Sequence, residues 1–342
     1  MGLFSTTTMK ALVTGATGFI GSHLTEELIK QGHKVKVLVR ETEDSSKDKR
    51  GILGLLKKLN VEIIQGDLLD EKSLDNAVKN VDVVFHLAAI ARPMAIPREE
   101  YFKVNEKGTK NLLEACKKKK IKKIVIMSSV SAVGQSNGSE AVNEKTKCKP
   151  VDTYGWSKLA QEKISLEYFK KFKMPIVFLR PPMVFGPRDV EMLKLFKAVK
   201  KRFFPLDGKS KCMEFLYVEN LVQACLLAVK YGENGEAYHI TNGEHYSINE
   251  IRSSMEKAMG KKVLPIKFPR IFFVSAGFSM ELVGKLFGFR PPFKHDTIDW
   301  MTKKLWYSDV SKARKVLKYV PKFSLDEGIK KTVDYYKKEG YL

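Results

Sequence analysis

Cysteine is scarce in this sequence, and its scarcity excludes two kinds of stabilising site. The chain has four cysteines in 342 residues, at positions 116, 148, 212 and 225. No two of them share the short spacing of a zinc knuckle, and their scatter does not suit a disulfide framework. We therefore expect a protein of a reducing compartment that holds no metal.

Long apolar runs are missing as well. No uninterrupted stretch reaches the roughly 20 apolar residues that a membrane-spanning helix needs, and no segment has the pattern of a secretory signal peptide. Internal repeats and low-complexity segments are also absent. With 44% hydrophobic and 29% charged residues, the chain has ample material for a buried core. Its length favours two unequal lobes. We also expect the protein to be cytoplasmic.

Acidic residues are outnumbered by basic ones, 39 against 61, which gives a net charge of +22. Such an excess is compatible with a nucleic acid, an anionic membrane, an anionic ligand or a lysine-rich proteome. No zinc-finger or RNA-recognition signature accompanies it, so we expect no nucleic-acid partner. Much of it lies in runs such as the lysine-rich stretch 117–123, at an expected helix C-terminus where the dipole favours cations. We interpret that run as solvated surface.

Short buried strands alternate with helical stretches through the first half of the chain. The strands are expected at 10–14, 34–40, 61–67, 81–86, 123–128 and 175–180. This alternation predicts an α/β protein with a doubly wound parallel (Rossmann) sheet covered on both faces. The pattern loosens after Arg180, where prolines accumulate. We expect residues 9–180, joined by a returning helix and strand within 214–241, to form a dinucleotide-binding domain. Residues 181–213 and 242–342 would form a smaller, segmented substrate lobe.

Three glycines lie where the first strand turns into a helix. The spacing Gly15-x-x-Gly18-x-x-Gly21 permits a tight turn and a close backbone approach to a pyrophosphate at the helix N-terminus. Arg40 ends the second strand, where an acidic residue normally holds the adenosine ribose. An arginine pairs well with a 2′-phosphate, which favours NADP(H) over NAD(H). Alternatively, Arg40 is a solvated strand end and Glu41, Glu43 or Asp44 contacts the ribose.

A tyrosine and a lysine, Tyr154 and Lys158, are spaced one helical turn apart on one face. A free tyrosine has a pKa near 10 and exchanges protons poorly at neutral pH. A nearby lysine ammonium would lower that pKa and could also bind the nicotinamide ribose. Ser129 follows the fifth strand, at the sheet edge where cofactors lie, and could hydrogen-bond a reacting carbonyl. The three residues together predict dinucleotide-dependent oxidoreductase chemistry.

From Met9 onward, the chain resembles the extended short-chain dehydrogenases/reductases, which lie within the NAD-dependent epimerase/dehydratase superfamily. The resemblance rests on Thr14–Gly21, Asp67-Leu68, His86–Ala89, Asn105 before Gly108-Thr109, Ser128-Ser129, Tyr154 with Lys158, and Arg180–Pro187. It implies that Ser129, Tyr154 and Lys158 are catalytic. It also implies a set of cofactor-binding residues: Gly15, Thr17, Gly18, Phe19, Ile20, Arg40, Asp67, Leu68, Ala88, Ala89, Asn105, Ser128, Tyr154, Lys158, Pro181 and Val184.

The resemblance implies a different role for each group of these residues. Asp67 and Leu68 would line the adenine pocket, Ala88 and Ala89 would contact the cofactor, and Asn105 would steady the helix behind the site. Each also has a structural alternative. Asp67 could cap a helix, the alanines could only pack, and Asn105 could be a satisfied buried amide.

Two departures from the family narrow the expected substrate. Family dehydratases carry an acid and a base near the serine, whereas residues 129–131 are Ser-Val-Ser. Sugar-nucleotide epimerases tend to have an arginine where this chain has Met213, although Lys209 or Lys211 could substitute. The rest resembles the branch of 3β-hydroxysteroid dehydrogenases and dihydroflavonol reductases. We therefore predict an NAD(P)-dependent reductase or dehydrogenase of an apolar secondary alcohol or ketone.

An apolar segment at 271–289 bears on the same question. It is too short to span a bilayer and is flanked by Arg270 and Arg290. It is either a core helix of the small lobe or a lid or membrane-resting helix that admits a lipophilic substrate. The second interpretation predicts peripheral contact with the inner face of an anionic membrane.

Two other functions stay open on the sequence alone. The chain could be an NAD-dependent nucleotide-sugar epimerase, which would turn over with no net change in the cofactor. It could also be a non-catalytic NADP-sensing or RNA-associated protein, although an intact Ser/Tyr/Lys set argues against that. The sequence leaves the oligomeric state open, a homodimer included.

Overall fold

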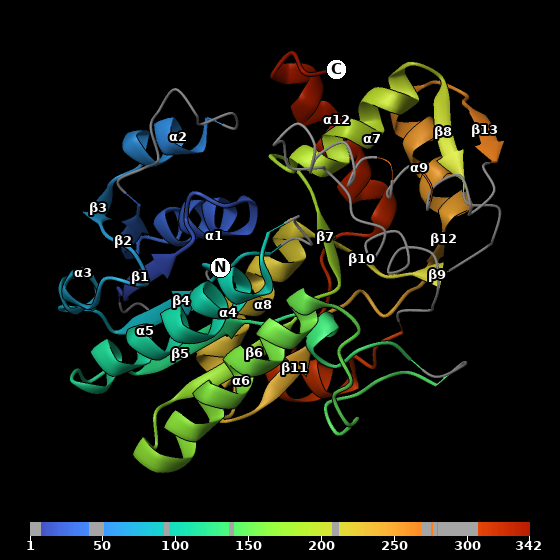
Figure 1. The fold of residues 1–342 in the computed structure, drawn as a ribbon. Helices are drawn as coiled ribbons and strands as arrows, with labels where there is room; N and C mark the ends of the chain where they lie inside the picture. Colours follow the sequence, from blue (N-terminus) through green and yellow to red (C-terminus); the bar gives the residue numbers. More distant parts are fainter. Residues whose placement is uncertain are drawn as a thin grey trace.

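Seven parallel strands form the centre of the molecule (Figure 1). The computed structural model describes residues 8–40, 51–91, 96–136, 140–206, 212–267, 275, 279 and 307–342. The sheet has the order β11-β6-β5-β4-β1-β2-β3. Its strands are β1 (Lys10–Thr14), β2 (Lys34–Val39), β3 (Val61–Gln65), β4 (Val83–His86), β5 (Lys123–Met127), β6 (Ile176–Arg180) and β11 (Ala237–His239). The predicted doubly wound α/β fold is confirmed, and each predicted strand lies within two residues of an observed one.

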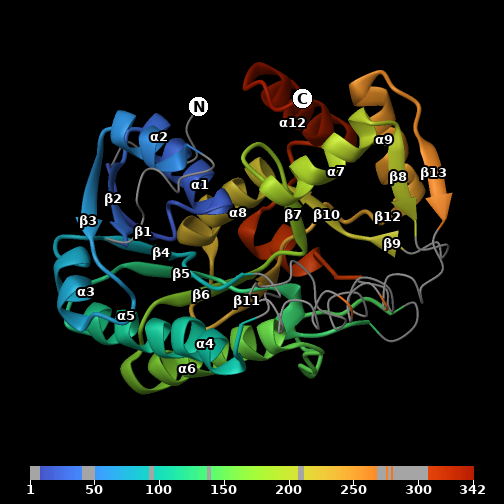
Figure 2. The same cartoon turned by 45° about the horizontal axis from the view of Figure 1, so that its top comes forward.

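Helices cover both faces of this sheet, as Figure 2 shows. One layer is built from α1 (Phe19–Lys30), α2 (Ile52–Lys58), α8 (Val218–Tyr231) and the π-helix η4 (Ala313–Leu317). The other is built from α3 (Glu71–Ala77), α5 (Gly108–Lys117) and α6 (Thr153–Phe172), with α4 (Arg98–Phe102) and the π-helix η2 (Lys103–Lys107) alongside. Strand β1 explains why both layers are needed. Its Ala11 and Val13 pack into the first layer and Leu12 into the second, so neither face is left to solvent.

The strand order reverses between β1 and β4. From β1 the chain continues to β2 on one side, and β4 pairs with β1 on the other side. The loops after these two strands therefore diverge at the carboxyl edge of the sheet. Such a switch point is where open α/β sheets bind their ligands.

A second group of elements lies beyond the sheet, at the upper right in Figure 1. It comprises β7 (Met183–Phe185), α7 (Val190–Lys200), β8 (Phe203–Leu206), β9 (Cys212–Met213), β10 (Phe215–Tyr217), β12 (Tyr246–Ser247), α9 (Ile248–Met259), β13 (Leu264–Lys267) and α12 (Leu325–Lys338). Helices α7, α9 and α12 share their own apolar core, which includes Phe196, Met255 and Ile329. We propose that this group is the substrate lobe, with β10 added to it from the range 214–241 that the sequence assigned to the dinucleotide-binding domain.

The apolar segment 271–289 lies outside the described residues, apart from isolated positions 275 and 279. In the part of the chain that the structure does describe, no helix is long and apolar enough to cross a membrane.

Candidate active site

The glycine turn after β1 has no room for side chains. Gly15 has a φ of +75°, and a Cβ there would lie 2.7 Å from the backbone nitrogen of Ala88, in the loop after β4. A Cβ on Gly21 would lie 2.1 Å from the carbonyl oxygen of Gly15. The turn is closed by a hydrogen bond from Gly18 N to Gly15 O of 2.9 Å. At Gly15 the two loops of the switch point therefore meet backbone to backbone, as a pyrophosphate-binding turn requires.

Helix α1 begins directly after this turn. Gly18 is its N-cap and offers no side chain to the first N–H groups, and the first turn holds no acidic residue. The positive end of the helix dipole is therefore available to an anion. Of the other residues expected here, Thr17 lies in the turn, while Phe19 and Ile20 open the helix. This cradle fits the pyrophosphate of a dinucleotide.

The residues expected around the adenosine lie at the ends of β2 and β3. Arg40 directly follows β2 and is exposed, whereas residues 41–50, including the alternative acidic contacts, lie outside the described residues. Asp67 Oδ1 accepts a hydrogen bond from Leu69 N of 2.8 Å. Its carboxylate thus stabilises a local turn, while the N-cap of the following helix is Asp70. Buried Leu68 is held through its carbonyl by Asn111 Nδ2, at 3.0 Å.

Asn105 connects the β4 loop to the helix that carries the tyrosine and lysine. It is fully buried in the π-helix η2. Its side chain accepts from Ile90 N at 2.8 Å and donates to Ser157 Oγ at 2.8 Å. Ser157 in turn donates to the carbonyl of Tyr154. Asn105 is a satisfied buried amide, as the alternative had it, and it also steadies α6, as the resemblance implied. Ala88 and Ala89 are half-buried in the β4 loop.

Ser129 follows β5 and caps a short 3-10 helix, η3 (Val130–Ala132), by accepting from Ser131 N at 3.1 Å. Pro181 supports this loop from β6, because its carbonyl accepts from Val130 N at 3.1 Å. Val184 is half-buried between two apolar clusters. The hydroxyl of Ser128 donates to Glu162 at 2.5 Å, so its side chain is engaged with α6.

Tyr154 is brought to Ser129 by a close backbone approach. A Cβ on Gly155 would lie 2.4 Å from the carbonyl oxygen of Ser131, so α6 packs directly on the η3 loop. Ser129 lies close enough to Tyr154 to lower the pKa of the tyrosine, but burial outweighs that effect and raises this pKa to about 12. A lowered pKa of Tyr154 was expected from the lysine one helical turn away. That expectation is wrong for this structure, because Lys158 directs its ammonium elsewhere.

Lys158 is 2% exposed, and its Nζ donates to the carbonyl of Met127 at 2.5 Å and to the side chain of Gln161. Burial lowers the pKa of Lys158 to about 7, and the negative charge of Glu162 opposes that effect. The lysine is thus close to its titration point near neutral pH. Tyr154, Lys158 and Ser129 are brought together as predicted.

Two further polar residues of this site, Gln161 and Glu162, were not singled out from the sequence. Glu162 accepts two hydrogen bonds from Arg180, at 2.9 and 2.6 Å, and both side chains are less than 8% exposed. Gln161 and Glu162 lie three and four positions after Lys158. That helical spacing was the available signal, because it puts them on the lysine's face of α6.

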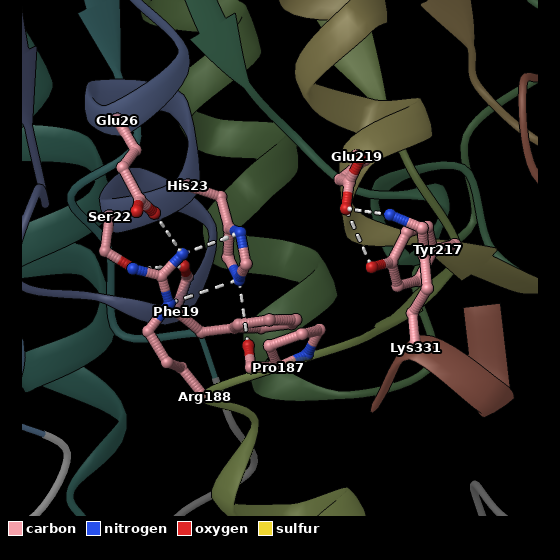
Figure 3. Close-up of polar contacts among 9 residues, drawn as sticks. All are labelled: Phe19, Ser22, His23, Glu26, Pro187, Arg188, Tyr217, Glu219 and Lys331. Atoms are coloured by element: carbon pink, nitrogen blue, oxygen red, sulfur yellow. Dashed lines mark hydrogen bonds and ion pairs between the residues drawn. The ribbon is translucent and has the colours of Figure 1, made fainter. Parts of the chain in front are cut away.

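An arginine joins the glycine-turn helix to the substrate lobe, as Figure 3 shows. Arg188 Nη2 lies 2.6 Å from Glu26 Oε2 and 2.7 Å from His23 Nδ1. His23 Nε2 lies 2.8 Å from the carbonyl of Pro187. Burial and then the charge of Arg188 lower the pKa of His23 to about 3. The neutral imidazole therefore accepts from Arg188 and donates to Pro187, which ties α1 to the loop before α7.

A second cluster in Figure 3 links α8 to α12. Glu219 accepts a hydrogen bond from the hydroxyl of Tyr217 at 2.9 Å and pairs with Lys331 at 3.3 Å. Together with the Arg188 cluster, it holds the substrate lobe against the helices that cover the sheet.

Comparison with known proteins agrees with this geometry. The model of the NAD dependent epimerase/dehydratase family matches residues 11–243. The chain is 28% identical to the bovine sterol-4-alpha-carboxylate 3-dehydrogenase, decarboxylating, over 95% of this chain and 91% of that one. It is 31% identical to an uncharacterized UDP-glucose epimerase of Bacillus subtilis (strain 168), over 96% and 98%.

Solved structures give the same picture. The crystal structure of UDP-glucuronic acid 4-epimerase from Bacillus cereus, in complex with UDP-glucuronic acid and NAD, superposes with a TM-score of 0.77. It is 30% identical to this chain and covers 97% of it and 100% of its own length. The glycine turn, the sheet order and the family match together show that this chain belongs to the NAD dependent epimerase/dehydratase family.

Proposed function

We propose that the protein transfers a hydride between a nicotinamide dinucleotide and a secondary alcohol or ketone. The observation that carries this proposal is the close packing of the Tyr154 end of α6 on the Ser129 loop, with the buried Lys158 against the end of β5, at the sheet edge that also holds the glycine turn. The bound nicotinamide supplies or accepts the hydride. Ser129 binds the substrate oxygen, Tyr154 exchanges the proton with that oxygen, and Lys158 would hold the nicotinamide ribose.

The substrate is proposed to be apolar, such as a sterol or a related lipophilic ketone. Residues 129–131 contain no carboxylate that could act in an elimination. Glu214, the nearest acid to Met213, is buried and accepts from the nitrogen and hydroxyl of Ser308, at 2.8 and 2.9 Å. Its carboxylate is therefore engaged by Ser308. The similarity to sterol dehydrogenases supports the same choice.

The proposed membrane contact has no further support from the described residues. It rests on the apolar segment 271–289, which lies outside them, and on the positive net charge. It stays a prediction, and co-sedimentation with anionic vesicles at low salt would test it.

Nucleotide-sugar epimerisation is the second candidate function. The Bacillus cereus UDP-glucuronic acid 4-epimerase covers nearly the whole chain at 30% identity, which favours it. Met213 counts against it, since a thioether cannot pair with a diphosphate. An epimerase returns the hydride to its substrate and leaves the cofactor concentration constant. Net cofactor consumption therefore separates the two functions.

A screen of candidate substrates tests the proposal directly. Purified protein with NADPH or NADH is offered steroid, flavonoid and aliphatic ketones, with UDP-glucose and UDP-glucuronic acid in parallel. We expect oxidation of the reduced cofactor with at least one apolar ketone. Turnover of a nucleotide sugar, with no activity on any apolar ketone or alcohol, would contradict the substrate assignment.

For the cofactor we propose a preference for NADP(H), carried by Arg40. An Arg40→Asp variant should weaken NADP binding by about 1.5–3 kcal/mol, the worth of a hydrogen bond to a charged group. Its NAD binding should change much less, because NAD has no 2′-phosphate. Titrating both cofactors into both proteins measures this. Equal affinities of the parent protein for the two cofactors would show that Arg40 does not select.

A further inference from the structure

A chain of buried hydrogen bonds runs from Thr14, at the end of β1, to Lys158. At one end, the backbone N–H of Ala88 donates to Thr14 Oγ1 at 3.3 Å, and Thr14 lies 2.8 Å from His86 Nδ1. His86 Nε2 lies 2.8 Å from Thr109 Oγ1, and Gln161 Nε2 donates to the same oxygen at 2.8 Å. Gln161 Oε1 then accepts from Lys158. The four side chains between Ala88 and Lys158 are at most 1% exposed.

The direction of every bond in this chain is fixed by proton counting. Thr109 has one hydroxyl proton and donates it to the carbonyl of Asn105 at 2.6 Å. Its other two neighbours must therefore donate to it, so His86 carries its proton on Nε2 and accepts from Thr14 on Nδ1. Gln161 must likewise turn its NH₂ group toward Thr109. In the opposite orientation, the NH₂ group of Gln161 would face the Lys158 ammonium, and both groups can only donate. The carbonyl of Gln161 therefore faces Lys158.

The other groups near Lys158 are neutral or paired with one another, so the carbonyl of Gln161 has a distinct role. Burial and then the charge of Lys158 lower the pKa of His86, on β4, to about 3, so the imidazole is neutral. Glu162, on the lysine's own helix, is paired with Arg180 of β6. From β5 comes only the carbonyl of Met127, while η2 and α5 bring Asn105 and Thr109, which are uncharged. Among the described residues, Met127 and Gln161 are the acceptors of Lys158, which leaves its third N–H for the cofactor ribose or Tyr154.

We propose that Gln161 is a positioning residue for Lys158, whose carbonyl holds the ammonium in place beside the carbonyl of Met127. This inference rests on the proposed function, because it acts through the lysine assigned there. The ammonium is the form that donates to the ribose, so activity falls as the pH rises through the pKa of Lys158. Removing the Gln161 acceptor lowers that pKa, and the loss of activity then begins at a lower pH.

The test compares Gln161→Leu and Gln161→Glu with a matched control on the same helix. Ser165→Ala removes a buried hydroxyl that donates to the backbone carbonyl of Gln161, at 2.7 Å, without touching Lys158. The pKa of Lys158 is measured by NMR in protein with ¹³C-labelled lysine side chains, and Lys158→Met identifies its signal. The pH dependence of kcat is measured in parallel.

We expect Gln161→Leu to lower the pKa of Lys158 by about one pH unit or more. Gln161→Glu keeps the shape and adds a negative charge, so it should raise that pKa above the parent value. Ser165→Ala should leave it unchanged, and the alkaline limb of kcat should move with the pKa in each variant. A purely structural role would reduce activity without moving that limb.

Two outcomes overturn different parts of the account. An unchanged Lys158 pKa in Gln161→Leu would refute the positioning role, whether or not the parent protein turns over. If Gln161→Leu does not fold, an unchanged pKa in the near-isosteric Gln161→Glu would refute it instead. If the Gln161 variants show the expected shifts of the Lys158 pKa by NMR but the parent protein has no turnover, the role of Gln161 is upheld and the proposed reaction is refuted.

Discussion

A Tyr154→Phe variant should lose turnover by about 10²–10⁴-fold, the usual contribution of a general acid or base. The phenyl ring keeps the packing of α6 against the Ser129 loop, which depends on Gly155. Only the oxygen that exchanges the proton is removed, so cofactor affinity should stay close to that of the parent. Steady-state kinetics and a cofactor titration by tryptophan fluorescence measure the two quantities.

Tyr101 provides the matched control for this variant. It is a buried tyrosine on α4 whose phenol lies close enough to influence the pKa of Tyr154. Tyr101→Phe removes a second phenol from the same region and should keep most of the activity. If Tyr154→Phe reduces ketones at a near-normal rate, the catalytic assignment is wrong.

The second large effect concerns stability. Replacing Glu162 with leucine should lower the free energy of unfolding by about 3–5 kcal/mol, because it leaves Arg180 buried without its partner. Glu162 and Arg180 join α6 to β6 through two short hydrogen bonds, and Ser128 donates to the same carboxylate. Urea denaturation of the parent and variant measures the difference.

A double variant separates the missing pair from a simple packing defect. Glu162→Leu combined with Arg180→Met removes both charges and should recover most of the lost stability, since buried ion pairs are often replaceable by apolar residues. A single variant as stable as the parent would show that the pair does not support the site. A double variant less stable than the single one would show that Arg180 finds other partners.

The sequence was sufficient to predict the sheet and the principal side chains of the site. Strand β1 was predicted at its observed bounds because a short apolar run followed by spaced glycines admits few other structures. Tyr154 and Lys158 were found because helical spacing is readable along the chain. Ser129 was found because it follows a buried strand.

Other features of the site depend on contacts between distant segments. Arg188 meets His23 and Glu26 across more than 160 residues of sequence, and no local pattern indicates that pairing. The direction of the Lys158 ammonium was likewise not predictable, because it follows from the carbonyl of Met127 and the amide of Gln161. For the same reason the pKa of Tyr154 was expected to be lowered and is instead raised by burial.

The most direct test of the account follows the hydride itself. Reduced cofactor carrying deuterium at C4 of the nicotinamide is incubated with the protein and the ketone found by the substrate screen. The account predicts one cofactor oxidised for each alcohol formed, with deuterium on the new carbinol carbon, and a transfer about 10²–10⁴-fold slower in Tyr154→Phe. Turnover of a nucleotide sugar at constant cofactor concentration, with no deuterium entering any apolar product, would contradict it.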